Sequence, residues 1–202
     1  MGNFDCRGRP TAGLIAAVGS VGGVWPGLSR AVAGEWPDAV VVRLGAAEPT
    51  DGDGLSWADV HEGETFGAEL RGALGTVDGV PVLGPDRRAC AWVGDSRVVP
   101  VVRGLAGGGP VVVDVGEWCA DAAQTASTLG VRTVCLAVPG TADGARAMRL
   151  AWGMAQCPRA GLVVAVMGGQ RAWVDAAVGG WGHVVAWRRR GAVRVVAEAM
   201  CG

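Results

Sequence analysis

A glycine-rich segment near the amino end of the 202-residue chain offers the clearest phosphate chemistry. The apolar run at 13–18 leads into residues 19–29, Gly-Ser-Val-Gly-Gly-Val-Trp-Pro-Gly-Leu-Ser, and a short helical pattern follows. Glycines let backbone N–H groups converge on phosphate oxygens, and the amino end of a helix favours negative charge. The order strand, loop, helix therefore predicts either a phosphate-binding loop or a structural turn that joins two elements.

A second candidate is Asp114, in the run Gly-Pro-Val-Val-Val-Asp-Val-Gly at residues 109–116. The run predicts a buried strand with an acid near its carboxyl end. Open α/β sheets bind ligands at this edge, so one interpretation is that Asp114 contacts Mg²⁺ through a water molecule. The other interpretation is that Asp114 caps the element that follows the strand.

The remaining residue types argue against several other classes of enzyme. His61 and His183 are the only histidines, and the sequence has no G-x-S-x-G elbow and no C-x-x-C pair. A hydrolase triad and a zinc site are therefore not indicated. The chain has neither Tyr nor Lys, and the loop glycines do not form G-x-G-x-x-G, which argues against a short-chain dehydrogenase or another dinucleotide enzyme.

Short, valine-rich runs alternate with helical patterns along the chain. Apolar runs without polar alternation are typical of parallel strands that are buried on both faces. The alternation predicts an α/β fold, a three-layer, doubly wound and mostly parallel sheet, as a single domain over residues 1–202. The predicted strands are 14–18, 39–42, 80–83, 111–115, 133–138, 162–167 and 184–187, and the predicted helices are 28–33, 66–74, 98–106, 120–129 and 142–156.

Charge and hydropathy indicate a cytoplasmic protein without a nucleic-acid partner. The net charge is −1, and all 18 basic residues are arginine. The amino end lacks the pattern of a signal peptide, and no apolar stretch is long enough to predict a transmembrane helix. Near the carboxyl end, Trp181, Trp187 and residues 188–190 combine aromatic and basic side chains, which predicts either contact with an anionic membrane surface or a solvated basic turn.

The loop resembles the K-G-G-x-G-K-S/T loop of the ParA/MinD group of P-loop ATPases. Residues 54–60, Gly-Leu-Ser-Trp-Ala-Asp-Val, are similar to the G-L-R-W-x-D-L stretch of actinobacterial CpaE/TadZ-like proteins, and residues 67–83 and 111–151 resemble the same branch. The resemblance implies a P-loop fold and a site for ATP and Mg²⁺. Its residues here are Gly22, Gly23, Val24, Gly27, Leu28, Ser29, Asp114 and Gly116.

The same alignment indicates a degenerate loop. When residues 22–23 are matched to the double glycine, Val21 and Pro26 replace the two lysines, and Gly27 replaces the hydroxyl that holds Mg²⁺. The second of these lysines normally neutralises charge on the β- and γ-phosphates. Arg43 also stands where the family has acidic residues at the end of the second strand. These losses predict a pseudo-ATPase with no catalytic residue and no bound cofactor.

The resemblance further implies a biological role. CpaE/TadZ-like proteins place a Tad/Flp-type pilus or secretion machine, so we expect this chain to act as an assembly or positioning factor through protein contacts. Dimerisation across the nucleotide face follows from the same resemblance. The alternative is a nucleotide-dependent switch ATPase of the ParA/MinD type that works with an atypical loop.

Overall fold

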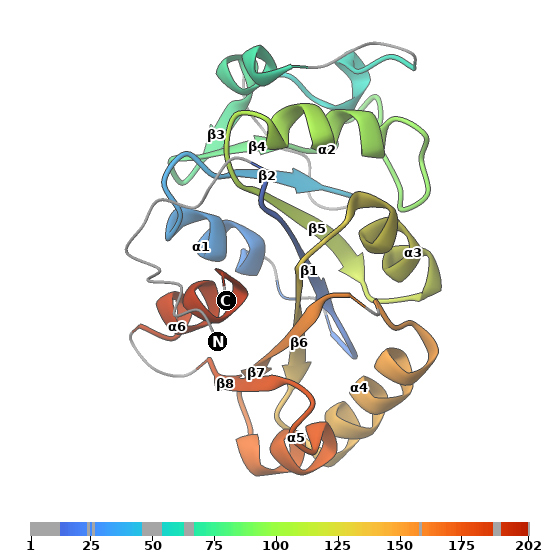
Figure 1. Cartoon of the computed structure of the whole chain (residues 1–202), viewed down its shortest axis with the longest axis vertical. Helices are drawn as coiled ribbons and strands as arrows, with labels where there is room; N and C mark the ends of the chain where they lie inside the picture. The colour runs from blue at the N-terminus through green and yellow to red at the C-terminus, as the bar shows by residue number, and fades with distance from the viewer. Residues whose placement is uncertain are drawn as a thin grey trace.

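An eight-stranded sheet forms the middle layer of the molecule (Figure 1). The computed structural model describes residues 13–23, 25, 27–45, 54–62, 67–157, 159–187 and 191–201. The strand order is β3-β4-β2-β5-β1-β6-β7-β8, and neighbours are parallel except for β3 and β4. The strands are β1 (Ile15–Ser20), β2 (Val40–Arg43), β3 (Gly75–Val77), β4 (Val80–Leu83), β5 (Val111–Glu117), β6 (Thr133–Pro139), β7 (Gly161–Met167) and β8 (His183–Ala186).

The valine-rich runs form the parallel strands that the sequence predicts. All six residues of β1 are buried, as are six of the seven in β6 and in β7, because helices cover both faces of the sheet. The predicted boundaries hold to within one or two residues. The antiparallel strand β3 is an addition that the apolar pattern does not predict.

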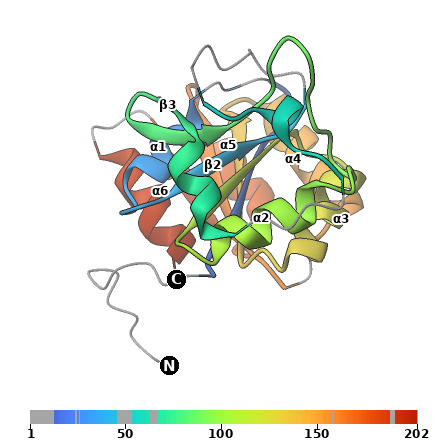
Figure 2. The ribbon, with the colours of Figure 1, turned by 90° about the horizontal axis from the view of Figure 1, so that it is seen from above.

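Helices cover both faces of the sheet, which gives three layers, seen from above in Figure 2. The coverage is unequal, with more helices on one face than on the other. Residues from α1 and α6 share one hydrophobic cluster with one face of the sheet. Residues from α2, α3, α4 and α5 share the other cluster with the opposite face. The helices are α1 (Leu28–Gly34), α2 (Val98–Ala106), α3 (Ala120–Leu129), α4 (Ala142–Met154), α5 (Arg171–Val178) and α6 (Ala192–Cys201).

One predicted helix is not an α-helix. The structure has two short 3-10 helices, η1 (Trp57–Asp59) and η2 (Ala68–Ala73), and η2 occupies most of the predicted helix at 66–74. Phe66, which begins the predicted apolar spacing, lies outside the described residues. The segment has only six residues before it turns into β3, and Gly72 weakens helical propensity, so the tighter 3-10 form is favoured.

The order in which successive strands are added to the sheet reverses beside β1, although the strands there remain parallel. It leaves β1 for β2 through α1 on one face, and it passes from β5 to β6 through α3 on the other face. The carboxyl ends of β1 and β5 therefore flank a topological switch point, where open α/β sheets bind ligands.

Three tryptophans form a stacked column in the layer of α2 to α5. Trp118 follows β5, Trp152 lies on α4, and Trp181 precedes β8. Successive ring centroids are 6.0 Å and 6.2 Å apart, with interplanar angles of 26° and 15°. Trp118 is buried and its Nε1–H donates to the carbonyl of Ala155 at 2.9 Å, whereas Trp181 is exposed. The column thus connects the core to the surface.

No helix within the described ranges is both long and apolar enough to cross a membrane.

Candidate nucleotide-loop site

The glycine-rich loop leaves the carboxyl end of β1 and ends at α1. Val21 is buried, and its N–H donates to the carbonyl of Ala137 on β6 at 3.0 Å, which fixes the start of the loop. Gly22 (φ 69°) and Gly27 (φ 88°) have left-handed backbones, which glycine adopts without a Cβ penalty. Gly22 and Gly23 are exposed, while Val24, the remaining predicted loop residue, lies outside the described residues.

The hydroxyl that meets Asp114 belongs to Ser29. Ser29 lies in the first turn of α1, and its Oγ–H donates to Asp114 Oδ2 at 2.7 Å. The backbone N–H of Gly116 donates to Asp114 Oδ1 at 3.2 Å. The alignment on the double glycine assigned the hydroxyl position to Gly27, two residues earlier. The hydrogen bond between Ser29 and Asp114 therefore joins α1 to β5, and the alignment on the double glycine does not predict it.

Leu28 separates Gly27 from Ser29 and points into the core. Its side chain is only 3% exposed and belongs to the cluster beneath α1, together with Val32. A leucine at this position satisfies the amphipathic pattern of α1. It brings no charge to the loop.

Trp25 lies over the glycine backbone of the loop. Its Nε1 is 3.5 Å from the position that a Cβ on Gly23 would occupy. This Nε1–H is the only buried side-chain N or O without a hydrogen-bond partner in the described part of the chain. An unsatisfied buried donor costs about 1–3 kcal/mol.

Two arginines lie near the loop and the acid. Arg43 at the end of β2 is paired in register with Asp114 on β5, and paired residues of adjacent strands project from the same face. The Arg43 side chain therefore projects from the same face of the sheet as Asp114, at a position where the resemblance implies an acid. Arg30 on α1 forms an ion pair with Asp78 at 3.4 Å, and its Nη2 is 3.5 Å from a Cβ placed on Gly27.

The site has few metal ligands. Within the described ranges, no group of three or more His, Cys, Asp or Glu side chains is placed to hold a metal ion. Ser29 Oγ and the Asp114 carboxylate are the kind of oxygen pair that holds Mg²⁺ in P-loop proteins, so these two groups fit the ion. The uncharged Leu28 does not fit the triphosphate that normally accompanies it.

The predicted site residues therefore divide into two sets. Ser29 and Gly116 contact Asp114 directly, and Leu28 lies next to Ser29 in α1. Gly22, Gly23 and Gly27 form the loop that joins β1 to α1. The sequence does not predict that the indole N–H of Trp25 lacks a hydrogen-bond partner, since this depends on how the indole packs.

Among the comparisons with known proteins, the solved structures show the fold. No protein-family model matches the chain, and no curated protein matches it either. Among solved structures, the ParA family ATPase from Chlorobium tepidum TLS superposes with a TM-score of 0.61 at 10% identity, covering 94% of this chain and 91% of that one. MinD in the MinC:MinD cell division protein complex of Aquifex aeolicus gives 0.57 at 10% identity, covering 92% of each chain. The chain thus has the P-loop ATPase fold of the ParA and MinD type.

Proposed function

We propose that this protein is a pseudo-ATPase that acts through protein contacts, and the buried Leu28 is the observation that carries the proposal. A nucleoside triphosphatase of this fold requires a cation that neutralises charge on the β- and γ-phosphates. Leu28 occupies the first residue of α1, beside the hydroxyl that meets Asp114, and its side chain is in the core.

The proposal includes a specific register for the loop. The general P-loop pattern G-x-x-x-x-G-K-S/T fits residues 22–29 if Gly22 and Gly27 are the two glycines and Ser29 is the hydroxyl. Ser29 then meets the strand-terminal acid, as the pattern requires. The lysine position falls on Leu28 in this register and on Pro26 in the double-glycine register. Both registers lack the loop cation.

The Asp114 carboxylate supports the same interpretation. One oxygen accepts the Ser29 hydroxyl and the other accepts the Gly116 N–H, so the acid is satisfied by protein donors. Arg43 adds a positive side chain on the same face of the sheet. The Ser29 hydrogen bond joins α1 to β5 without a nucleotide.

Calorimetric titration with ATP and with ADP, each with Mg²⁺, tests the proposal. We expect no binding at millimolar nucleotide and no phosphate release. The variant Leu28→Lys restores the motif cation, and gain of binding in this variant would support the register. Mg²⁺-dependent turnover by the unmodified chain that vanishes in Asp114→Ala would refute the pseudo-ATPase.

We further propose that the protein acts in the cytoplasm as a CpaE/TadZ-like assembly or positioning factor for a Tad/Flp-type pilus or secretion system. The similarity of residues 54–60, 67–83 and 111–151 to that branch supports this role. Deletion of the gene should reduce or misplace the pili, and the protein should co-purify with components of the assembly machine. Normal pilus number and position in the deletion strain would contradict it.

A second candidate is an atypical nucleotide-binding switch, which the Ser29–Asp114 hydrogen bond favours. This pair is the part of the Mg²⁺ site that the chain retains, and dimerisation across this face would accompany nucleotide binding. A ligand at 100 times its Kd stabilises the native state by about 2.7 kcal/mol, so Mg²⁺ with ADP or ATP should raise the Tm. An unchanged Tm at millimolar nucleotide excludes the switch.

A further inference from the structure

Charge is distributed very unevenly along this nearly neutral chain. Residues 1–130 contain nine arginines and sixteen acidic residues, whereas residues 131–202 contain nine arginines and three acidic residues. The two parts therefore have net charges of −7 and +6. Such asymmetry between parts of a chain is typical of proteins that bind an anionic partner or a membrane.

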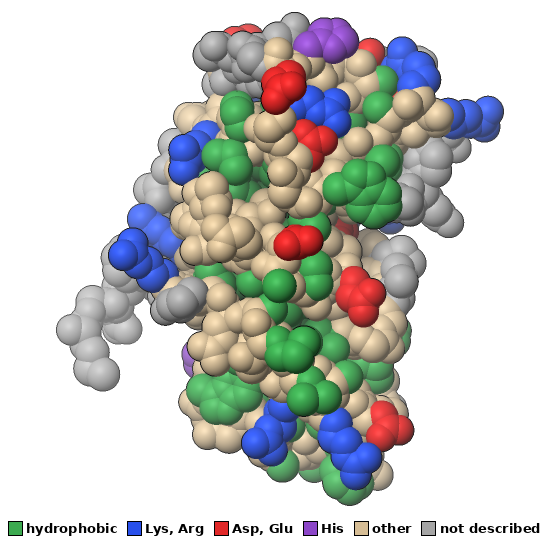
Figure 3. Space-filling model, turned by 90° about the vertical axis from the view of Figure 1, so that its right-hand side faces the viewer, with side chains coloured by type: hydrophobic (Ala, Val, Ile, Leu, Met, Phe, Trp, Pro, Cys, Tyr) green, Lys and Arg blue, Asp and Glu red, His purple; other side chains and the backbone are tan. Residues whose placement is uncertain are grey.

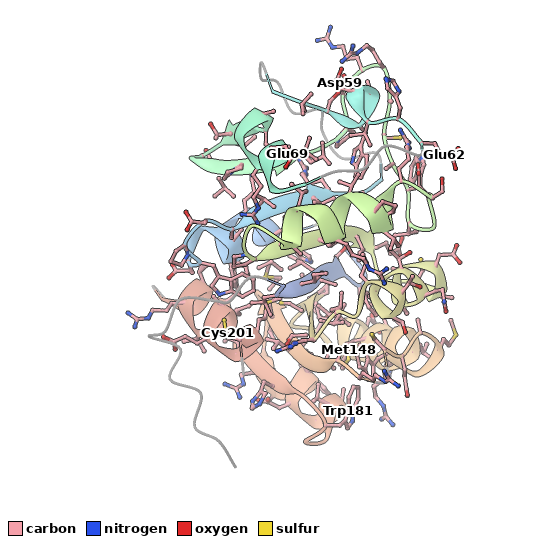
Figure 4. All side chains as sticks on the ribbon, turned by 45° about the horizontal axis from the view of Figure 1, so that its top comes forward. Asp59, Glu62, Glu69, Met148, Trp181 and Cys201 are labelled. Atoms are coloured by element: carbon pink, nitrogen blue, oxygen red, sulfur yellow. The ribbon has the colours of Figure 1, made fainter. Side chains whose placement is uncertain are left out.

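Part of this asymmetry falls on described residues, although the predicted basic cluster at 188–190 lies outside them. Among the described residues, the part up to residue 130 has seven arginines and eleven acidic residues, and the later part has six arginines and three acidic residues. The basic part supplies β6, β7 and β8, which are consecutive at one end of the sheet, together with α4, α5 and α6. The acidic part supplies the opposite end. Figure 4 shows Asp59, Glu62 and Glu69 at one end of the molecule and Trp181 at the other.

The outer faces of α4 and α5 together with Trp181, called the basic end below, carry most of the exposed large apolar side chains among the described residues. Leu150 and Met154 on α4 are 66% and 81% exposed, Trp173 on α5 is 51% exposed, and Trp181 is 45% exposed. Figure 3 shows hydrophobic and arginine side chains intermingled on the lower half of the face that includes α4. The acidic part has Trp92 as its one exposed large hydrophobic residue within the described ranges.

Two arginines of this end are available to an external anion. Arg146 and Arg171 form ion pairs with acids on their own helices, Asp143 and Asp175. Arg149 on α4 precedes Leu150 and is exposed, and Arg159, which follows α4, is exposed as well. Neither arginine has an acidic partner in the described part of the chain.

From these observations we propose that the basic end, defined by the outer faces of α4 and α5 with Trp181, docks onto an anionic lipid surface. Binding to such a surface combines electrostatic attraction with burial of apolar side chains in the interface, where tryptophan is favoured. Protruding Leu150, Met154 and Trp173 supply the apolar part, and the unpaired arginines supply the charge. The stack with Trp152 holds Trp181 in its exposed position.

Other anionic partners fit these side chains less well. A nucleic-acid backbone offers phosphates to the arginines but leaves exposed Leu150 and Met154 in water. The acidic end of a second copy would satisfy the charge but has only Trp92 to cover the apolar residues. The inference does not involve the nucleotide loop, so it stands or falls independently of the proposed function.

Vesicle flotation of the full chain tests the proposal. The protein should float with vesicles of equal parts phosphatidylglycerol and phosphatidylcholine, and not with phosphatidylcholine alone. Binding should weaken as salt rises from about 0.05 M to about 0.5 M, because screening shortens the reach of surface charges. No flotation with the anionic vesicles at low salt overturns the proposal, as does binding to DNA or an acidic protein without vesicle binding.

Matched substitutions at the two ends provide the control. Arg149→Glu should weaken vesicle binding about fivefold or more, since one arginine near an anionic surface contributes about that factor. Arg87→Glu makes the same change in net charge at an exposed arginine of the acidic end that forms no ion pair with another described residue, so it should have little effect. Trp173→Ser and Trp92→Ser form a second pair with similar exposure, of which only the first should weaken binding. Equal losses within either pair would show that total charge or general hydrophobicity, and not the basic end, governs binding.

Discussion

Replacing Ser29 with alanine removes the 2.7 Å hydrogen bond that joins the first turn of α1 to Asp114 on β5. A hydrogen bond to a charged group contributes about 1.5–3 kcal/mol to the free energy of unfolding. Alanine is a better helix former than serine by about 0.5 kcal/mol, which offsets part of this loss. We therefore expect Ser29→Ala to lower the unfolding free energy by about 1–2.5 kcal/mol. For a domain of this size, that corresponds to a fall in Tm of about 2–10 °C.

Urea unfolding of a small set of variants measures this effect and isolates its cause. Ser29→Thr keeps the hydroxyl and should lose less stability. Ser127→Ala changes an exposed serine in α3, so it reports helix propensity alone and should be neutral or slightly stabilising. In a double-mutant cycle with Asp114→Ala, the coupling energy should be about 1 kcal/mol or more. If Ser29→Ala costs no more than Ser127→Ala, or if the cycle is additive, the pair does not join α1 to β5 in solution.

Three other predictions concern stability and thiol reactivity. Arg71→Met should lower the unfolding free energy by about 2–4 kcal/mol in urea titrations, because the guanidinium donates to three backbone carbonyls that precede β2, precede β5 and end α2; an unchanged midpoint would contradict this role. Burial raises the pKa of the Cys135 thiol to about 12, so a thiol reagent at pH about 8 should modify exposed Cys119 and leave Cys135 unmodified until the protein unfolds, as mass spectrometry would show. Hydrogen bonds from Arg97 lower the pKa of Asp95 in the folded state, so this carboxylate contributes stability that is present above its unfolded pKa of about 3.9 and is lost as the pH falls through its folded pKa. Asp95→Asn should therefore reduce the acid dependence of urea unfolding below about pH 4, and an identical pH profile for the variant would count against this linkage.

The architecture is predictable from sequence because its parallel strands are continuous apolar runs. Burial on both faces removes the polar alternation of an ordinary half-exposed strand, and this signal survives even where the boundaries shift by a residue. The edge strand β3 consists of Gly-Thr-Val and has no such signal, so the sequence alone did not predict it. The helices α5 and α6 were also not predicted. In α6, Val193, Val196 and Met200 recur at helical spacing, but the segment follows a basic cluster near the end of the sequence.

The site was less predictable, because it depends on contacts between distant parts of the chain. Asp114 and the loop could be identified from their positions at the ends of apolar runs. The contact between Ser29 and Asp114 joins residues 85 positions apart, and matching the double glycine directed attention to Gly27 as the hydroxyl position. The orphaned N–H of Trp25 depends on side-chain packing that no spacing rule encodes. The separation of basic and acidic residues between the two ends of the sheet could not be predicted from the sequence, because the strand order decides which segments lie together.

The tryptophan column has an optical consequence. Because Trp118, Trp152 and Trp181 are held at centroid separations of 6.0 Å and 6.2 Å in a fixed, asymmetric arrangement, their electronic transitions couple and should contribute a tryptophan circular dichroism signal in the folded state. Trp152→Phe would interrupt the coupling at its centre and leave the outer indoles isolated. Since Trp181 ends the column at the surface, any ligand that repositions this indole would change the signal, so the molecule carries its own spectroscopic reporter of events at that surface.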